Sequence, residues 1–169
     1  EAAGLAGCSI EDATGDEARP IYDFNQAVER VAAAAEAARA LPRDFVFTAR
    51  AENFLHGRND LDDTIRRLQA YEKAGADVLY APGLTDIAVV RTICQSVSRP
   101  VNVLAVPQLT MAQLEEAGVR RVSLGSKLTN YAFASVERAS REMLDHGTFT
   151  FARDATPYAT LQNMFSPGR

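Results

Sequence analysis

The 169-residue sequence has no tryptophan, only two histidines and only two cysteines. Cys8 falls in a predicted strand and Cys94 in a predicted helix. We therefore expect two buried free thiols, as in proteins of a reducing compartment, rather than a disulfide. The two histidines are far apart in the sequence and lack the spacing of a zinc site. The composition argues against both a small disulfide scaffold and a histidine-based metal site.

Long apolar runs and basic runs are also missing. No stretch of about 18 apolar residues is present to span a bilayer, which predicts a cytoplasmic protein without a membrane partner. Aspartate and glutamate outnumber lysine and arginine by 22 to 18, for a formal net charge of -4. Because binding to a phosphate backbone needs a clustered basic face, nucleic acid is not an expected partner. A small anionic substrate is compatible with this charge.

What the sequence does contain is a repeated pattern of helix end, glycine and strand. Residues 3–11, 74–82 and 117–125 align without gaps, and each begins with Ala-Gly and continues into a predicted strand. Glycine at such a helix end can take a positive φ angle. Two more strands are predicted at 45–50 and 101–105, so we expect five strands in all.

Helical periodicity and capping residues characterise the segments between these strands. Asp23 and Asp60 are candidate N-caps, and Thr110 has Gln113 at capping-box spacing. Ser126 either caps the last helix or belongs to a phosphate site at its N-terminus. The expected helices cover residues 24–40, 60–74, 85–97, 110–117 and 126–145, and the second should bury the stripe Leu61, Ile65, Leu68 and Tyr71.

Alternating strands and helices predict a parallel sheet covered by helices, either an open doubly wound sheet or a closed eight-stranded barrel. The glycines that follow the strands stand alone, so there is neither a dinucleotide fingerprint nor a nucleotide-binding P-loop, and we favour the barrel. Five units are too few to close it. We therefore expect three further units to precede Glu1 or to come from another chain, and the apparent helix end at residues 1–4 fits this interpretation.

On this interpretation, residues 1–145 form the C-terminal part of a (β/α)8 TIM-barrel domain, strands four to eight, and residues 146–169 form a helical tail. Large apolar side chains recur in the tail among polar ones: Phe149, Phe151, Tyr158, Leu161, Met164 and Phe165. Side chains of this kind are usually buried, so we expect the tail to pack on a neighbouring subunit.

Charged residues close two neighbouring strands. Glu11 and Asp12 end the first, and Arg50 and Glu52 follow the second. Barrels place their chemistry at the carboxyl ends of the strands, so these groups are candidates for one site. Two plainer interpretations stay open at this point: Asp12 caps a turn, and Arg50 is a structural partner of Glu11 or Glu52.

Three blocks, at residues 7–12, 47–52 and 70–77, resemble the isocitrate lyase and phosphoenolpyruvate mutase superfamily. The resemblance runs from Glu1 to about Asp145. It implies an enzyme that uses Mg2+, or Mn2+, to make or break C–C or P–C bonds in small α-keto or α-hydroxy carboxylates, through an enolpyruvate-like intermediate. It also implies a homo-oligomer, a dimer or a tetramer, that exchanges C-terminal helices.

The same resemblance implies roles for individual residues. Glu11 matches the family's acidic metal ligand at the end of strand four and is a catalytic candidate. Arg50 matches the arginine of strand five, a catalytic candidate that binds the substrate's carboxylate or phosphonyl group, and Glu52 matches an acidic position that orients it. Asn102 is a further substrate-binding candidate, because it shares a strand face with Leu104, where the family's asparagine would align.

The sequence departs from the lyases of this superfamily in two places. Residues 13–22 stand where those lyases have a basic loop with a catalytic cysteine, and they contain no cysteine. An isocitrate or methylisocitrate lyase is therefore not expected. Pro82 and Gly83 stand where the lyases carry a glutamate, and nearby Tyr80 is interpreted as barrel filling. A non-catalytic member that acts as an oligomeric barrel protein is the alternative to an enzyme.

Overall fold

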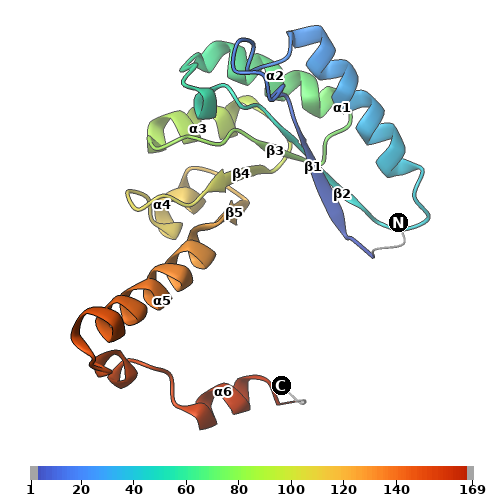
Figure 1. Ribbon diagram of the computed structural model, residues 1–169. Coiled ribbons are helices and arrows are strands. Elements are labelled where there is room, and N and C mark those ends of the chain that lie inside the picture. Colours follow the sequence, from blue (N-terminus) through green and yellow to red (C-terminus); the bar gives the residue numbers. More distant parts are fainter. Residues whose placement is uncertain (1–3, 167–169) are drawn as a thin grey trace. The chain divides into compact units, whose positions relative to one another are not determined.

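The computed structural model describes residues 4–166 (Figure 1). The helix end predicted at residues 1–4 therefore lies largely outside the described residues. The chain forms two compact units, one up to Leu124 and the other from Gly125. In order, the elements are β1 (Gly7–Glu11), α1 (Phe24–Arg39), β2 (Val46–Arg50), the 3-10 helix η1 (Phe54–His56), α2 (Leu61–Lys73), β3 (Val78–Tyr80), α3 (Ile87–Ser96), β4 (Val101–Leu104), α4 (Met111–Glu116), β5 (Arg121–Ser123), α5 (Lys127–His146), the 3-10 helix η2 (Thr150–Arg153) and α6 (Tyr158–Met164).

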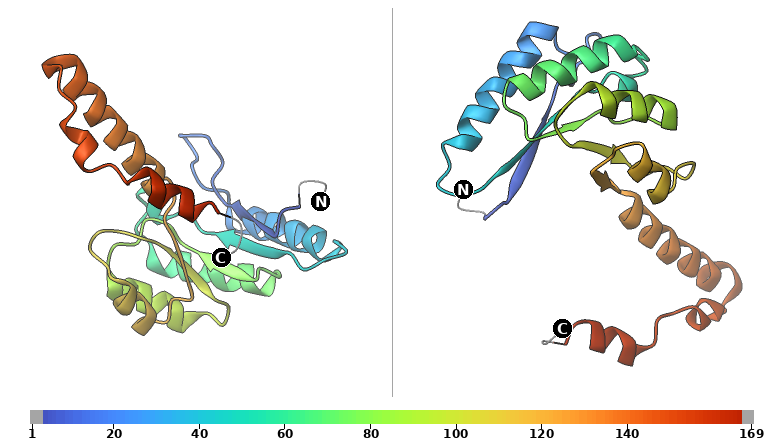
Figure 2. Two further views of the ribbon diagram at one scale, coloured as in Figure 1. Left: turned by 90° about the horizontal axis from the view of Figure 1, so that it is seen from below. Right: turned by 180° about the vertical axis from the view of Figure 1, so that it is seen from behind.

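The first unit is a parallel sheet in sequential order, β1-β2-β3-β4-β5, as the alternation of strands and helices predicted. Helices pack against one of its faces (Figure 2). The core between them is apolar, and its fully buried side chains include Phe47, Leu68, Tyr71, Leu79 and Ile93. The repeated glycines have the expected positive φ angles, such as 109° at Gly75 and 95° at Gly118.

The other face of the sheet carries a polar register row that crosses all five strands, and we call it the polar face after this row. Successive Cα partners in this row are Glu11, Arg50, Tyr80, Asn102 and Arg121. The row begins at the last residues of β1, β2 and β3 and ends at the first residue of β5. A stagger of this kind is how the strands of a barrel tilt against its axis.

The polar face is also strongly curved. Arg121 on β5 donates from Nη1 to Thr48 Oγ1 on β2, over 3.2 Å, although two strands lie between them. In a flat sheet these two strands would be about 14 Å apart, at about 4.8 Å per strand spacing. The polar face is therefore concave, as the inner wall of a partial barrel would be. The α/β class and the barrel-like form of the sheet are both seen in the structure.

Local capping confirms some of the predicted helix starts and corrects others. Asp60 accepts the Asp63 N–H, and Thr110 forms the full capping box with Gln113. The prediction for Asp23 was wrong in detail: it occupies the N-cap of α1, but its side chain makes no capping hydrogen bond. Ser126 likewise occupies the N-cap of α5 without a capping hydrogen bond, and its Oγ accepts from the Asn130 side chain. Helix α3 starts at Ile87 rather than residue 85, since Asp86 caps it.

Helix α2 buries a different stripe from the predicted one. Leu68 and Tyr71 are fully buried, whereas Leu61 and Ile65 are only partly buried. Arg67 is only 4% exposed. The 3.6-residue pattern of apolar residues missed Arg67 because an arginine is buried only where acidic partners meet it, and those partners come from distant parts of the chain.

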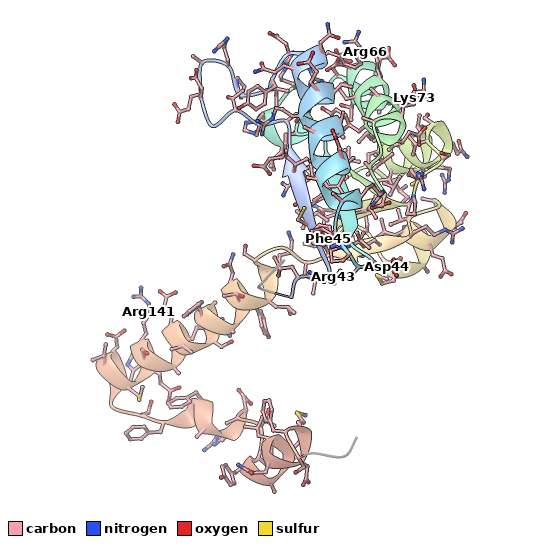
Figure 3. The ribbon with its side chains drawn as sticks, turned by 90° about the vertical axis from the view of Figure 1, so that its right-hand side faces the viewer. Arg43, Asp44, Phe45, Arg66, Lys73 and Arg141 are labelled. Carbon is pink, nitrogen blue, oxygen red and sulfur yellow. The ribbon has the colours of Figure 1, made fainter. Side chains whose placement is uncertain are left out.

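A carboxylate ties β2 to its neighbours at the amino end of the sheet. Asp77 Oδ2 accepts the N–H of Phe47 over 2.8 Å, and Asp77 Oδ1 pairs with Arg39 of α1. Arg39 also donates to the Gly75 carbonyl. We call this set the amino-end clasp. Figure 3 shows Arg43, Asp44 and Phe45 at the turn that leads into β2, and Arg66 of α2 at the opposite end of the unit.

Both cysteines are free thiols, as predicted, but Cys8 is exposed rather than buried. It lies on β1, an edge strand, so it has a neighbouring strand on one side only. Cys94 is partly buried, and burial raises the pKa of its thiol. Across residues 4–166 there is no helix with both the length and the apolar character needed to cross a membrane.

The second unit consists of α5, η2 and α6. Glu142 of α5 organises its turn: Thr148 Oγ1 donates to it over 2.8 Å, and the N–H groups of Thr150 and Phe151 donate as well. These hydrogen bonds lower the pKa of Glu142. Large apolar side chains of this unit are exposed: Leu128, Tyr131, Phe133, Val136, Leu144, Phe149, Tyr158, Met164 and Phe165. The two compact units divide between Leu124 and Gly125, ahead of α5. The domain boundary at residue 145 stays a prediction.

Candidate active site at the carboxyl ends of the strands

Three of the predicted site residues meet at the carboxyl ends of β1 and β2. Glu11 and Arg50 are register partners, and Arg50 Nη1 lies 3.2 Å from Glu11 Oε2. Arg50 Nε donates to Glu52 Oε1 over 2.7 Å. The exposed fractions of the side chains fall from 49% for Glu11 to 24% for Arg50 and 1% for Glu52. The site thus has an open carboxylate, a half-buried cation and a buried carboxylate in line.

The ring of Tyr80 lies against the guanidinium of the same arginine. The Arg50 guanidinium carbon lies 5.1 Å from the centre of the Tyr80 ring, within the range of a cation–π contact. Tyr80 is the next member of the register row after Arg50. Its interpretation as barrel filling is therefore incomplete, because the ring also holds a charged site residue. Within residues 4–166, no hydrogen bond or ion pair uses the Nη2 group of Arg50, which is thus available to a ligand.

Burial raises the pKa of Glu52. The hydrogen bond and positive charge of Arg50 act in the opposite direction, while the charges of Glu11 and Asp12 add to the increase. Glu52 therefore holds a proton more readily than an ordinary glutamate does. Two glutamates of one site, one open and one buried, occupy environments suited to different tasks.

Asp12 is neither a turn cap nor an open ligand, but a buried acceptor behind the site. Its Oδ1 accepts the backbone N–H of Glu52 over 2.8 Å. Its Oδ2 accepts from the Tyr71 hydroxyl over 2.6 Å and from Arg67 Nη1 over 3.1 Å. Both donors come from α2. We call Asp12, Arg67, Tyr71 and the Glu52 N–H the carboxyl-end clasp.

Asp63 completes the surroundings of this clasp. It accepts from Arg67 Nε over 2.7 Å and from Asn53 Nδ2 over 2.9 Å. Burial raises the pKa of Asp63, but the hydrogen bonds from Arg67, Asn53 and Arg66 outweigh it and lower the pKa to about 2. Burial also raises the pKa of the Tyr71 hydroxyl, and the charge of Asp12 adds to this effect. At neutral pH, Asp63 is therefore ionised beside Arg67, and Tyr71 keeps its proton for Asp12.

Asn102 lies in the polar row but not beside Arg50. It is the second residue of β4, between Tyr80 and Arg121 in register, and it shares a strand face with Leu104 as predicted. Its Nδ2 donates to Ser123 Oγ over 3.1 Å, while its buried Oδ1 has no hydrogen-bond partner in the described part of the chain. The structure thus places an unused acceptor on the concave face, and the substrate role of Asn102 stays a prediction.

The described residues supply only part of the donor set for a metal ion. No group of three His, Cys, Asp or Glu side chains able to hold a metal ion occurs among residues 4–166. Glu11 does supply the right kind of donor, because its carboxylate is half exposed and Mg2+ prefers hard oxygen ligands while keeping several waters. The residues present fit one ligand of such a site.

The segment after β1 forms a small closed loop. Thr14 donates its N–H to the Pro20 carbonyl over 2.9 Å, and Asp16 Oδ1 accepts the Ala18 N–H over 2.9 Å. An antiparallel bridge joins Ala13 to Ile21. The loop therefore satisfies much of its own backbone, and it carries carboxylates and one arginine but no thiol.

Sequence reasoning missed the buried partners of the site. Arg67 was overlooked as a basic residue on a helix, and its four-residue spacing from Asp63 was the available signal. Tyr71 was predicted to be core but not to bond Asp12. Arg121 was not singled out, because its place in the polar row follows from the stagger of the strands, which the sequence does not show.

Comparisons with known proteins agree with the fold and with the resemblance. A family model described as phosphoenolpyruvate phosphomutase matches residues 1–144. The 2-methylisocitrate lyase of Escherichia coli is 34% identical over 128 residues, which cover 69% of this chain and 42% of that protein. A crystal structure of a candidate lyase/mutase from Burkholderia cenocepacia superposes with a TM-score of 0.93 at 50% identity, over 98% of this chain and 61% of that one.

A third match shares the fold at lower identity. The crystal structure of phosphonopyruvate hydrolase in complex with oxalate and Mg2+ has a TM-score of 0.78 at 24% identity, over 96% of this chain and 59% of that one. The chain spans about half the length of the curated relatives it matches.

Proposed function

Because the chain belongs to the phosphoenolpyruvate phosphomutase family, within a superfamily of lyases and mutases that act on small carboxylates, we propose that the protein is a Mg2+-dependent enzyme of this kind. It makes or breaks a C–C or P–C bond in a small α-keto or α-hydroxy carboxylate through an enolpyruvate-like intermediate. The observation that carries this proposal is the line of Glu11, Arg50 and Glu52 at the carboxyl ends of β1 and β2.

Each residue of this line has one task in the proposal. Arg50 binds the substrate's carboxylate through its Nη2 edge, since Glu52 occupies its Nε and Tyr80 lies against its face. Glu52 orients the guanidinium. Glu11 would hold the ion through its half-exposed carboxylate, and the remaining ligands would come from outside the described residues. When bound, Mg2+ lowers the cost of negative charge on an enolate oxygen.

The sheet supports a closed barrel as the scaffold of this site. In the proposal, β1 to β5 correspond to strands four to eight of a (β/α)8 barrel, and the first three strands lie outside the 169 residues. The stagger of the polar row and the reach of Arg121 to Thr48 both favour it, because they require a tilted and curved sheet. The open carboxylate of Glu11 then lies at the mouth of the barrel, where such enzymes hold their substrates.

We do not assign the methylisocitrate lyase reaction to this protein, although several relatives, among them the Escherichia coli protein, carry that name. A C–C lyase of that type needs a group that delivers a proton to the substrate. The loop at residues 13–22 contains no cysteine, and its Thr14 and Asp16 are engaged within the loop itself. A decarboxylase, a different C–C lyase or a phosphonomutase is the class that we propose.

The test is binding of Mg2+ and oxalate, an analogue of an enolate, to the full-length protein by calorimetry. Arg50→Ala removes the only group in this line that can pair with the ligand's carboxylate. We expect it to weaken oxalate binding by about 100-fold, which is about 3 kcal/mol. Arg91→Ala, on α3 and 3.7 Å from Glu116, removes a surface charge and should leave oxalate binding unchanged.

The possible outcomes separate the proposal from its alternative. Unchanged oxalate binding in Arg50→Ala would remove Arg50 from the site. A full-length protein that binds neither Mg2+ nor oxalate would instead be a non-catalytic member that acts through its oligomeric form.

We also propose that the protein is a homo-oligomer, a dimer or a tetramer, and that the second unit makes its interface. The support is the set of large apolar side chains on α5 and α6, which bury little within one chain. Light scattering on the full-length protein should give a multiple of the chain mass. Replacing Phe165 and Leu144 by serine should reduce the molar mass of the assembly. A monomeric mass for the unmodified protein would contradict the proposal.

A further inference from the structure

The carboxyl-end clasp links the candidate site to α2 through a single carboxylate. Asp12 directly follows Glu11 in the chain, and its Oδ1 accepts the N–H of Glu52. Glu52 in turn accepts from Arg50 Nε, and Arg50 faces Glu11. Glu11, Asp12, Glu52 and Arg50 therefore form a closed ring of one peptide bond and three polar contacts. Any movement of Asp12 alters the spacing of the other three.

Arg67 and Tyr71 fix the position of Asp12. Their donors lie 3.1 Å and 2.6 Å from Asp12 Oδ2. Arg67 cannot turn away easily, since Asp63 binds its Nε and the Tyr22 carbonyl accepts from its Nη1. The side chains of Asp12 and Arg67 are only 1% and 5% exposed. No solvent therefore competes for these contacts.

A buried ion pair of this kind is a poor device for stability alone. The cost of taking both charges out of water offsets much of their attraction, and well-packed apolar residues often hold a helix against a sheet equally well. What the charged arrangement adds is direction, because the hydrogen bonds fix where each Asp12 oxygen points. Asp12 Oδ1 points at the one backbone N–H that sets the position of Glu52.

We propose that Arg67 and Tyr71 are positioning residues of the active site, which act through Asp12 to hold Glu11, Arg50 and Glu52 at their working distances. The functional part of this inference rests on the proposed Mg2+-dependent activity. Neither residue touches the substrate. Their effect on ligand binding is indirect and resembles that of the outer partners of metal ligands, whose loss commonly costs about 10-fold or more.

The amino-end clasp is the matched control. There too a carboxylate, Asp77, accepts an N–H of β2 and pairs with an arginine of a covering helix, Arg39. It lies at the other end of the same strand, away from Glu11 and Arg50. A variant of Arg39 therefore perturbs the same kind of joint on the same strand without moving the site.

The experiment compares Tyr71→Phe, Arg67→Lys and Arg39→Lys in the full-length protein. Tyr71→Phe keeps the ring and removes only the hydroxyl donor to Asp12. We expect it to weaken the binding of oxalate in the presence of Mg2+ by about 10-fold. Arg67→Lys keeps the charge but loses the fork and should weaken binding as well, whereas Arg39→Lys should stay within about twofold of the unmodified protein. All proteins are compared at a temperature where thermal unfolding shows them folded.

A second measurement does not depend on the ligand. Hydrogen–deuterium exchange of a peptide covering residues 50–54 reports on the Glu52 N–H, and a peptide covering residues 45–48 reports on the Phe47 N–H. Tyr71→Phe should speed exchange in the first peptide and not in the second, and Arg39→Lys should do the reverse.

The outcomes are distinct. Oxalate binding that is unchanged in both Tyr71→Phe and Arg67→Lys overturns the positioning role, even if both variants are less stable. If the unmodified protein binds no oxalate, the proposed function fails instead, and the exchange data decide whether Tyr71 holds Glu52 in place. Equal exchange at residues 50–54 in all proteins overturns that contact as well.

Discussion

At each end of strand β2, a carboxylate accepts a backbone N–H and pairs with an arginine of a covering helix. We call each of these arrangements a joint. The two joints differ in burial and in the residues around them. At the amino end, Asp77 and Arg39 have side chains that are 29% and 52% exposed. At the carboxyl end, Asp12 and Arg67 are 1% and 5% exposed. Water therefore shares the first joint and is kept from the second.

The neighbours of the two joints differ as well. Arg39 of the amino-end clasp also donates to the Gly75 carbonyl, so that joint supports the backbone around it. The carboxyl-end clasp adjoins Glu11, Arg50 and Glu52, three charged side chains that pair with one another. The comparison teaches that the two ends of one strand are held in different surroundings: the amino end by a water-exposed pair, and the carboxyl end by a buried pair beside the residues of the candidate site. In a barrel, the carboxyl ends of the strands are the ends that carry the chemistry.

The largest expected effect comes from breaking the buried joint. Arg67→Met leaves the buried Asp12 and the partly buried Asp63 without their shared cation. Removing one partner of a buried ion pair typically costs about 3–5 kcal/mol. We expect the free energy of unfolding, measured with urea, to fall by about that amount.

Arg39→Met is the counterpart of this test at the amino end. A solvent-exposed pair contributes about 1 kcal/mol or less, so the loss should be several times smaller. Equal losses in the two variants would show that burial does not distinguish the two ends.

A smaller effect concerns the acid that lies beside the buried joint. Burial raises the pKa of Glu52 in the folded protein. A carboxyl with a raised pKa binds its proton more tightly when folded, so its contribution to stability falls as the pH rises from its usual pKa of 4.5 toward the raised value. Glu52→Gln does not titrate at this position. As the pH rises through this window, the free energy of unfolding of the unmodified protein should therefore fall relative to that of the variant.

Urea unfolding at several pH values, with a chelator present, measures this difference. Two stability curves that stay parallel from pH 4 upward would contradict the raised pKa. Asp77→Asn serves as the substitution control at the amino end, where the carboxylate likewise accepts a β2 N–H.

The sequence was sufficient to predict most of the sheet. The Ala-Gly repeats and the alternation of strand and helix predicted five parallel strands, because those signals are local and each unit repeats them. The charged ends of β1 and β2 predicted that Glu11, Arg50 and Glu52 would meet, because parallel neighbours bring their carboxyl ends to one edge.

What the sequence could not show depends on distant contacts. Arg67 and Tyr71 follow Asp12 by 55 and 59 residues, and no sequence periodicity links them to it. The same holds for Tyr80 and Arg121, which join the polar row only through the stagger of five strands. Cys8 is exposed because β1 has a neighbouring strand on one side only among the described residues, whereas the proposed barrel would place another strand beside it.

The two joints on β2 also limit where residues can be inserted or deleted during evolution. Asp77 and Asp12 accept the N–H groups of Phe47 and Glu52, so both ends of this segment are pinned. One added or deleted residue between them would detach one carboxylate and turn the side chains beyond it to the opposite face. The loop at residues 13–22 has no such double anchor on a strand, and length variation should collect there. Among homologous genes, the segment that bears Arg50 should therefore keep its length while the loop beside it does not.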